Sequence, residues 1–391
     1  MRPKPSWVDI ALPAPKVDAG KAMSTQEGFG RILFDLAGGD SALAKRIVTT
    51  SPDVSVSTNL GGWINRRSLF DRRDQSDVFK AEKVISAQTW ITSPAGQHVE
   101  LGIAENNLFL MLAAAGLAGP LFGARLLPIG TLYDPFIARG LDALNYACYQ
   151  DARFMLAATP SGITLAPEGG AHQSVHTPLI GIGQPGLAYF EPAFVDELAI
   201  IMAWGFRHMQ AEQGGSVYLR LSTRPLVQPT RSVGEALAAA IVAGGYWLIE
   251  PGPDAELAVV YCGALAPEAL AAHAQIAEDV PGAGLLAITS PDRLHQGWRD
   301  AAAARRAGDR AARAHVEVLL AALPTGAGLV AVMDGHPATL SWLGAVAGQR
   351  IATAGVDRFG QSGDIPDLYR LHGLDADAIV DAAASLCLSR P

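Results

Sequence analysis

The chain has 391 residues, of which 49% are hydrophobic and 17% charged, a composition that predicts two or three folded domains and excludes a disordered chain. The formal net charge is −8 and all six lysines precede residue 84, so there is no basic stripe to neutralise a nucleic-acid backbone. The longest apolar run, residues 108–118, falls well short of the ~20 residues that cross a bilayer, which argues against a membrane partner.

Both the N-terminus and the cysteines indicate a cytoplasmic protein. Residues 1–23 contain four prolines and little periodicity, so we expect an arm without regular structure. The basic residues near the start are not followed by an apolar stretch, which argues against a secretory signal or an anchor. The three cysteines are far apart, as suits buried thiols in a reducing compartment: Cys148, Cys262 and Cys387.

After the arm, strand-like apolar runs alternate with longer amphipathic segments. Such alternation is typical of a parallel sheet wrapped by helices. Strands are expected to start near Arg46, Phe154 and Ser216. Helices are expected from Glu105 onward and over residues 192–209. The sequence therefore predicts an α/β domain in the first half of the chain.

A second series of strand-like runs lies over residues 257–261, 284–288 and 328–333. Helical segments separate these runs, so they predict a second α/β unit. A polar stretch and an Ala-rich helix over residues 233–243 lie between the two series. The domain boundary is therefore expected between residues 226 and 243.

Residues 62–98 do not fit this alternation. The segment is rich in acidic and basic residues and has no clear hydrophobic period. Loops of this length inside a compact domain are usually functional or disordered. We expect such a loop directly before the segment that contains Glu105.

Glu105 stands at the start of a helix whose remaining positions are almost all apolar. Because such a helix is buried, its first turn is expected to be buried as well. One interpretation is a carboxylate that the helix dipole stabilises as part of a cap. The other is a carboxyl group in an apolar pocket that can hold or share a proton.

A second polar cluster, over residues 165–176, follows a predicted strand. Its small residues let the backbone approach a ligand, and ligands bind at the carboxyl ends of parallel strands. Four side chains are candidates for binding a substrate: Glu168, His172, Gln173 and His176. The alternative is a solvated surface loop. No metal site is expected, because the two histidines lack the helical periodicity of a zinc pair.

Several common motifs are absent from the sequence. There is no GxxxxGK[ST] and no strand-anchored GxGxxG, so neither a nucleotide kinase nor a simple nicotinamide dehydrogenase is indicated. A GxSxG nucleophile elbow is also missing.

Four segments together resemble a known family. They are ENN at residues 105–107, YDPF at 133–136, EGGAHQ at 168–173 and FGQSGD at 359–364. They are similar to the second half of the transketolase-like thiamine diphosphate enzymes, and especially to the homodimeric first component of the pyruvate dehydrogenase complex. The resemblance implies two three-layer α/β/α domains with mainly parallel sheets. These are a pyrimidine-binding domain over residues 24–228 and, after a linker and helix over 229–243, a C-terminal domain over 244–391.

The resemblance also implies roles for individual residues. Glu105 takes the place of the glutamate that hydrogen-bonds the aminopyrimidine ring of the cofactor and promotes proton transfer. Phe136 matches the aromatic residue that stacks on this ring, with Tyr133 beside it; a core aromatic is the alternative. His172 matches a histidine that faces the substrate and can donate to an oxyanion or shuttle a proton. Asp53 lies where the family has an acidic residue at the cofactor end of the first strand.

One part of the family's cofactor site has no counterpart in this sequence. The family holds the diphosphate through magnesium with a GDG motif and a later asparagine, in a domain that precedes this half. The GGD at residues 38–40 is not that motif, because a helix follows it directly. The resemblance thus implies that this chain binds the pyrimidine half of thiamine diphosphate. A diphosphate-binding, α-type subunit would supply the magnesium site in a heterotetramer with a homodimeric core.

The resemblance implies a β-type subunit of a split 2-oxo acid dehydrogenase, which decarboxylates a 2-oxo acid and passes the acyl group to a lipoyl acyltransferase. Transketolases have a sugar-binding histidine where Pro160 stands, and a phosphate-binding arginine that residues 221–223 lack, although Arg224 lies nearby. A split transketolase-like ketol transferase and a non-catalytic regulatory or scaffold homologue are the alternatives. Related enzymes have a mobile active-site loop near residues 62–98. We therefore expect residues 68–96 to be poorly ordered until cofactor and partner bind, unless they are a solvated insertion.

Overall fold

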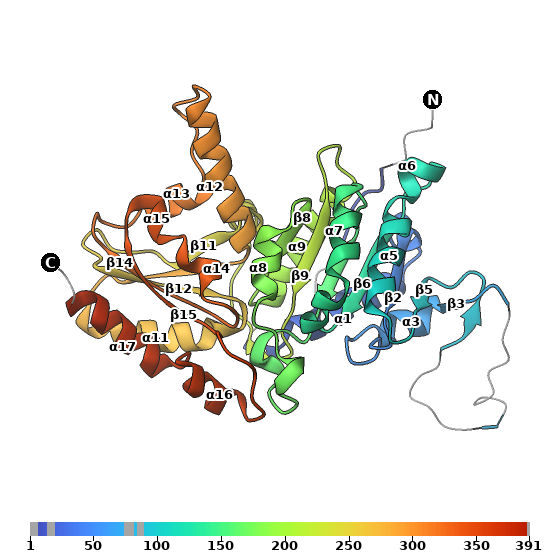
Figure 1. The fold of residues 1–391 in the computed structure, drawn as a ribbon, viewed down its shortest axis with the longest axis horizontal. Coiled ribbons are helices and arrows are strands. Elements are labelled where there is room, and N and C mark those ends of the chain that lie inside the picture. Colours follow the sequence, from blue (N-terminus) through green and yellow to red (C-terminus); the bar gives the residue numbers. More distant parts are fainter. Residues whose placement is uncertain (1–6, 14–19, 74–81, 84–89, 389–391) are drawn as a thin grey trace.

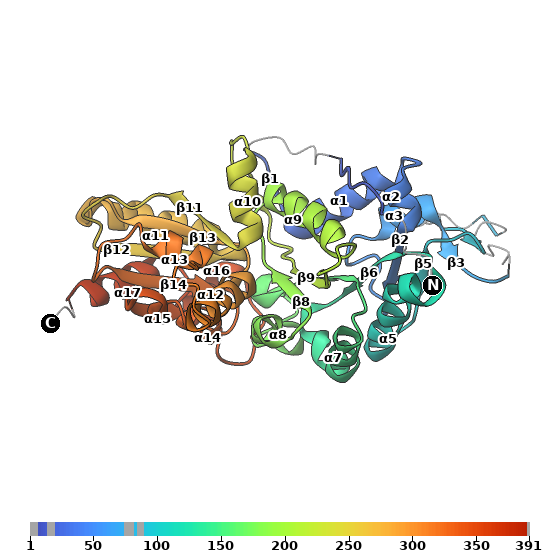
Figure 2. The ribbon, with the colours of Figure 1, turned by 90° about the horizontal axis from the view of Figure 1, so that it is seen from above.

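The computed structural model describes residues 7–13, 20–73, 82–83 and 90–388 (Figure 1). Their strands form an eight-stranded sheet, a five-stranded sheet and a two-stranded pair. The eight-stranded sheet is built from the N-terminal half of the chain and the five-stranded sheet from the C-terminal half. Helices lie on both faces of the two large sheets (Figures 1 and 2). The predicted α/β class with mainly parallel sheets is therefore confirmed.

The N-terminal sheet is parallel throughout, with the strand order β4-β3-β5-β2-β6-β7-β9-β8. Its strands are β2 (Ile47–Ser51), β3 (Leu69–Phe70), β4 (Thr92–Ser93), β5 (His98–Glu100), β6 (Leu127–Leu132), β7 (Met155–Ala158), β8 (Leu187–Phe190) and β9 (Ser216–Arg220). Because the strands are parallel, their carboxyl ends all lie at one edge of the sheet.

Two groups of helices cover this sheet, one on each face (Figure 2). On one face lie α1 (Thr25–Ala37), α3 (Gly61–Arg67) and α9 (Val195–His208), and on the other α5 (Glu105–Gly116), α7 (Leu141–Tyr149) and α8 (Thr177–Gly183). Successive residues of β7 belong to different cores: Met155 packs with the first group of helices and Leu156 with the second. This alternation explains why β7 is apolar at every position.

The C-terminal sheet has the order β11-β13-β12-β14-β15, and only β11 is antiparallel to its neighbour. Its strands are β11 (Gly245–Ile249), β12 (Leu257–Cys262), β13 (Gly284–Ile288), β14 (Gly328–Met333) and β15 (Arg350–Ala354). The helices around it are α11 (Ala266–Asp279), α12 (Pro291–Arg306), α13 (His315–Leu320), α14 (Ala338–Ser341), α15 (Gly344–Ala347), α16 (Ile365–His372) and α17 (Ala376–Leu388). The first and last of these pack together on one face.

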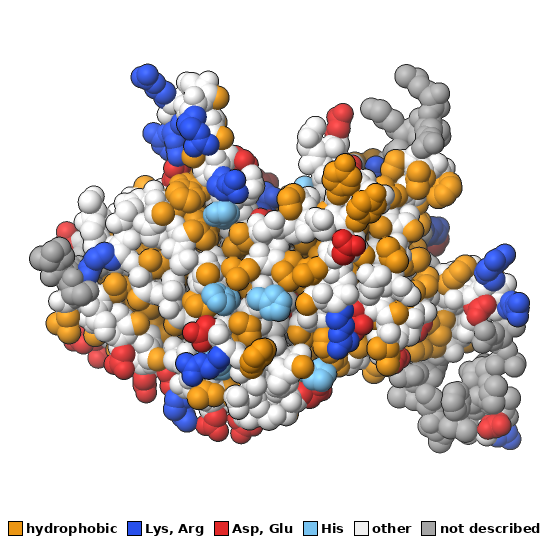
Figure 3. Space-filling model, viewed as in Figure 1, with side chains coloured by type: hydrophobic (Ala, Val, Ile, Leu, Met, Phe, Trp, Pro, Cys, Tyr) orange, Lys and Arg blue, Asp and Glu red, His pale blue; other side chains and the backbone are white. Residues whose placement is uncertain are grey.

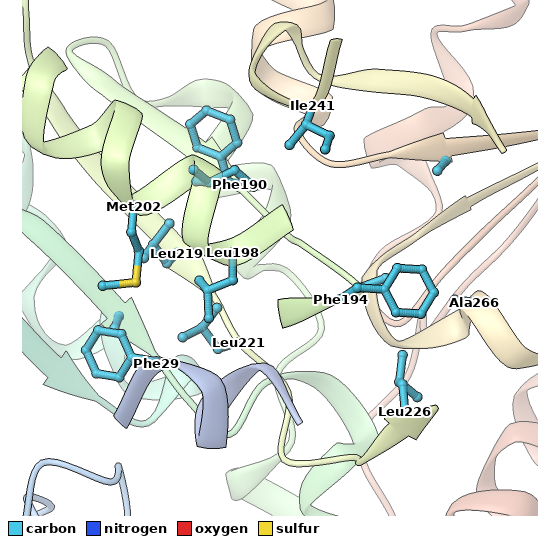
Figure 4. Packing of buried hydrophobic residues seen from close by; sticks show 14 of the residues in the cluster. Phe29, Phe190, Phe194, Leu198, Met202, Leu219, Leu221, Leu226, Ile241 and Ala266 are labelled. Atoms are coloured by element: carbon cyan, nitrogen blue, oxygen red, sulfur yellow. The ribbon is translucent and has the colours of Figure 1, made fainter. Parts of the chain in front are cut away.

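One hydrophobic core runs from the first sheet into the second. It includes Phe29 of α1, Leu198 of α9 and Leu219 of β9, and it continues through Ile241 of α10 (Glu235–Ala243) to Ala266 at the start of α11 (Figure 4). All five side chains are fully buried. The two sheets are therefore held together by a continuous apolar contact as well as by the chain.

The predicted N-terminal arm is partly described and lies against the first sheet's helices. Val8 is buried, its N–H donates to Gln210 Oε1 at 2.8 Å, and its carbonyl accepts from Gln210 Nε2 at 3.0 Å. Ahead of α1, β1 (Ala22–Met23) pairs with β10 (Leu226–Val227). Among the described residues, no helix is long and apolar enough to span a membrane.

The expectation of an irregular loop over residues 62–98 is wrong for part of the described segment, which contains a helix and short strands. Helix α3 covers the start of the segment, and β3, β4 and β5 follow, hydrogen-bonded as the edge of the N-terminal sheet. These strands are only two or three residues long, too short to produce a hydrophobic period. Residues 74–81 and 84–89, within the loop expected over 68–96, lie outside the described residues.

Candidate functional site

The sequence-predicted residues gather at the carboxyl edge of the N-terminal sheet. Tyr133 directly follows β6, and Glu105 opens α5 five residues after the end of β5. The segment that carries His172 comes after β7, through the short turns η2 (Gly162–Leu165) and η3 (Gly170–His172). Five side chains at this edge are linked by contacts, and we call them the site cluster: Glu105, Tyr133, Phe136, Arg139 and His172.

Glu105 is the buried acidic member of the cluster. It is the first residue of α5, and its side chain is 9% exposed. The preceding N-cap residue, Ala104, makes no side-chain cap. Glu105 instead pairs with Arg139, whose Nη1 donates to its Oε1 at 2.5 Å. The carboxylate is therefore held by a charged partner from another element of the fold.

Arg139 contacts both Glu105 and Phe136. Phe136 and Arg139 lie three residues apart in η1 (Asp134–Gly140), a 3₁₀ helix in which such positions share one side. The guanidinium carbon of Arg139 is 3.6 Å from the centre of the Phe136 ring, a cation–π contact. With 51% of its side chain exposed, Arg139 covers the site from the solvent side.

His172 lies on the other side of the aromatic pair. Its ring meets Phe136 edge-on with 5.5 Å between centroids and Tyr133 with 6.2 Å, and Tyr133 stacks on Phe136 at 5.8 Å. Glu168 Oε2 is 3.7 Å from His172 Nδ1. Both side chains are about half exposed, so the imidazole is accessible from the solvent.

The remaining three predicted residues make contacts elsewhere. Asp53 is exposed at the same sheet edge, and its N–H donates to Glu100 Oε1 at 2.8 Å. Gln173 is buried, and its Nε2 donates to the carbonyl of Gln361 in the C-terminal half at 2.9 Å. His176 is exposed at the start of α8. These three residues take no part in the contacts that link the site cluster.

The sequence analysis did not single out two residues that make central contacts in this region, Arg139 and Asp134. Arg139 could have been found from its position three residues after Phe136. Asp134 lies inside the YDPF motif, yet its burial depends on partners far along the chain, including Tyr218 and Arg220.

The described part of the chain has no group of three or more acidic, histidine or cysteine side chains that could hold a metal.

Comparisons with known proteins fit this arrangement. Residues 14–223 match the family described as the pyruvate dehydrogenase E1 component middle domain. The pyruvate dehydrogenase E1 component of Mycolicibacterium smegmatis is 28% identical over 381 residues, which cover 92% of this chain and 39% of that protein. The corresponding protein of Cupriavidus necator is 27% identical over 223 residues, covering 53% of this chain and 24% of that protein. The chain thus spans less than half the length of these relatives.

Solved structures show the same fold. Transketolase from Campylobacter jejuni has a TM-score of 0.70 over 96% of this chain and 48% of its own, at 17% identity. A split-gene transketolase, solved as an inactive β4 tetramer, has a TM-score of 0.60 over 94% of this chain and 100% of its own, at 21% identity. Since the family model covers more than half of the sequence, the chain belongs to the pyruvate dehydrogenase E1 family of transketolase-like thiamine diphosphate enzymes.

Proposed function

We propose that this chain binds the pyrimidine half of thiamine diphosphate and acts as the β-type subunit of a split 2-oxo acid dehydrogenase. The observation that carries the proposal is the setting of Arg139. Its guanidinium is a planar N–H donor, held by a buried carboxylate and by an aromatic face. A planar aminopyrimidine needs the same two contacts, so Glu105 and Phe136 fit this group.

Each residue of the site cluster has a distinct task in this proposal. Glu105 holds a ring N–H and moves a proton at that nitrogen, in a pocket where burial strengthens the hydrogen bond. Phe136, supported by Tyr133, orients the ring. His172 is exposed next to both aromatics and donates a proton to the substrate oxygen. Once bound, the cofactor supplies the electron sink for decarboxylation of a 2-oxo acid.

The proposal includes a partner, because the described residues offer no magnesium site for the diphosphate. An exposed apolar surface on helices that cover one face of the N-terminal sheet supports this partnership. Hydrophobic side chains gather over α5, α7 and α6 (Ala118–Phe122), as Figure 3 shows. The most exposed are Leu110, Phe122, Tyr146 and Tyr149. Patches of this kind mark protein contacts, and we assign this one to the α-type subunit and the homodimeric core of a heterotetramer.

The choice of substrate class rests on Arg224. A ketol transferase would need a free cation for the phosphate of its sugar substrate. Both terminal nitrogens of Arg224 donate to Glu268 of α11, at 2.6 and 2.8 Å, and the pair is largely buried. This engagement favours a 2-oxo acid over a ketose phosphate. A lipoyl acyltransferase would then take the acyl group.

Titration calorimetry tests the proposal. The purified chain with magnesium should bind thiamine diphosphate weakly or not at all, because it lacks a cradle for the diphosphate. After addition of the partner recovered from the source cell, binding should become stoichiometric, and 2-oxo acids should be decarboxylated. Tight binding by the chain alone would contradict the shared cofactor, and turnover of ketose phosphates alone would favour the ketol transferase.

A further inference from the structure

Asp134 lies between Tyr133 and Phe136, but its side chain points away from the site into the protein. Its side chain has no exposed surface, and four groups donate to its carboxylate. The donors are Ser174 Oγ, Thr177 Oγ1 at 2.6 Å, Tyr218 OH and Arg220 Nε at 2.9 Å. We call these residues, together with Glu191, the Asp134 network.

The network joins two segments that meet at the site cluster. Asp134 belongs to η1, which carries Phe136 and Arg139, while Ser174 and Thr177 come directly after the segment with His172. A single carboxylate therefore holds both segments.

Ser174 has a fully determined hydrogen-bond pattern. Its hydroxyl donates to Asp134 and accepts from the N–H of Gly162 at 2.8 Å and from Arg220 Nη2 at 3.1 Å. A hydroxyl has one donor and two acceptor sites, so every site is used. Such a saturated arrangement has one low-energy geometry, which makes the connection rigid.

Arg220 supplies the positive charge of the network. It is fully buried at the end of β9, and its Nη1 donates to Glu191 Oε1 at 2.7 Å. Tyr189 and Tyr218 donate their hydroxyl protons to Glu191 and Asp134. Burial raises the pKa of both tyrosines well above the usual range, so they remain donors. Buried charges of this kind often stabilise a fold no better than apolar side chains, which points to a role in positioning.

We propose that Asp134 is a positioning residue that fixes His172 relative to Tyr133 and Phe136. It touches neither cofactor nor substrate, and acts through the two segments that it joins. The contribution to catalysis rests on the proposed function; the contribution to local geometry is a property of the chain itself. Since small misplacements of reacting groups slow enzymes by large factors, Asp134→Asn should reduce turnover about tenfold to a hundredfold.

Glu197→Gln provides a matched control. Glu197 is also a buried carboxylate with one tyrosine and one arginine as partners, Tyr246 at 2.5 Å and Arg231 at 3.2 Å. It accepts from the N–H of Ala193, two residues before α9, and among the described residues none of its hydrogen-bond partners belongs to the site cluster. Both substitutions remove one buried charge, but only Asp134→Asn should disturb the site.

The test measures the isolated full chain by NMR with labelled histidine. The imidazole signal of His172, assigned by its loss in His172→Gln, depends on the ring currents of Tyr133 and Phe136. Asp134→Asn should shift this signal and speed hydrogen exchange over residues 168–177, while Glu197→Gln should change neither. If both variants change the signal equally, or neither does, the proposal is wrong.

Thr177→Val serves as the milder variant if Asp134→Asn does not fold. It removes one donor to Asp134 and leaves the pair with Arg220 intact, so it should shift the His172 signal in the same direction by less; an unchanged signal would refute the proposal. In the reconstituted assembly, Asp134→Asn should lower kcat more than it raises KM. An assembly without thiamine-dependent activity would overturn the proposed function, while the NMR result would still decide the positioning role.

Discussion

Arg139 pairs with Glu105 through a 2.5 Å hydrogen bond while its guanidinium lies 3.6 Å above the ring of Phe136. These are the two side chains to which we assign the aminopyrimidine ring of the cofactor. The ring and the guanidinium cannot occupy the same contacts. Arg139 therefore has to move toward the solvent, where half of its side chain already lies, before the ring binds.

This competition predicts that Arg139→Met tightens cofactor binding. Methionine is unbranched and flexible like the stem of arginine, but it neither competes for the carboxylate nor carries a charge. In the reconstituted assembly, the Kd for thiamine diphosphate should fall severalfold, because the cofactor no longer has to displace the Arg139 guanidinium from Glu105 and Phe136. Titration calorimetry measures the change, with the exposed Arg299 of α12 as control through Arg299→Met. Weaker binding by Arg139→Met would mean that Arg139 holds the cofactor instead of competing with it.

Glu105→Gln should abolish most of the activity while leaving the fold intact. Glutamine fills the same space, and its side-chain carbonyl can still accept from Arg139, but it cannot take up and return a proton. Turnover at saturating cofactor should fall about a hundredfold or more, as loss of a general acid–base group does.

Steady-state kinetics of the reconstituted assembly, alongside a thermal unfolding curve, checks this expectation. Glu278→Gln, on the exposed side of α11, is the control and should retain full turnover. Unchanged turnover in Glu105→Gln would remove this carboxylate from the mechanism.

The fold was easiest to predict where strands are buried on both faces. The runs that became β12, β13 and β14 are continuously apolar, because helices cover both sides of the C-terminal sheet. Strand β6 did not stand out, since it contains Pro128 and Gly130, residues that usually argue against a central strand. The short edge strands β3 and β4 gave no signal at all.

The candidate site was predictable only as far as its motif residues. Glu105, Phe136 and His172 could be proposed as site residues because their surrounding segments resemble those of a family. The role of Asp134 could not be, since it depends on contacts with Ser174 and Arg220, which lie 40 and 86 residues further along the chain. A side chain whose partners are set by tertiary packing leaves no local pattern.

Asp292, at the start of α12, predicts a specific pH dependence of stability. It accepts from the N–H of Tyr189 at 3.2 Å, and burial raises its pKa to about 7 from the usual 3.8. The carboxyl group of Asp292 thus binds its proton more tightly in the folded protein than in the unfolded chain. The resulting stabilisation is complete below about pH 4 and is lost as the pH rises through about 7.

Asp292→Asn should remove this loss of stability at high pH, because asparagine keeps the acceptor oxygen and carries no charge. The difference in free energy of unfolding, variant minus wild type, should therefore increase from pH 5 to pH 8 by on the order of 1 kcal/mol. Urea unfolding at several pH values measures the difference. Asp300→Asn, an exposed change on the same helix, is the control, and a difference that stays constant with pH would contradict the role of Asp292.

Residues 68–96 are predicted to become protected from hydrogen exchange when partner and cofactor bind. Strands β3 and β4 fix the two ends of this segment at the sheet edge, next to β5, which leads to Glu105. Between them lie Asp71, Arg72 and Arg73, charged residues with little apolar surface for packing. Closure of such a segment over the site would exclude water from a reactive intermediate.

Hydrogen exchange should be compared for the chain alone and for the assembly with cofactor and a non-decarboxylating substrate analogue. The paired residues of β3 and β4 are already hydrogen-bonded, so the gain should be concentrated between residues 71 and 91. Helix α3, which precedes the segment, is the internal control and should exchange equally in both states. If residues 71–91 also exchange equally, the segment is a solvated insertion without a gating role. Protection that needs the partner but not the substrate analogue would instead identify it as part of the subunit interface.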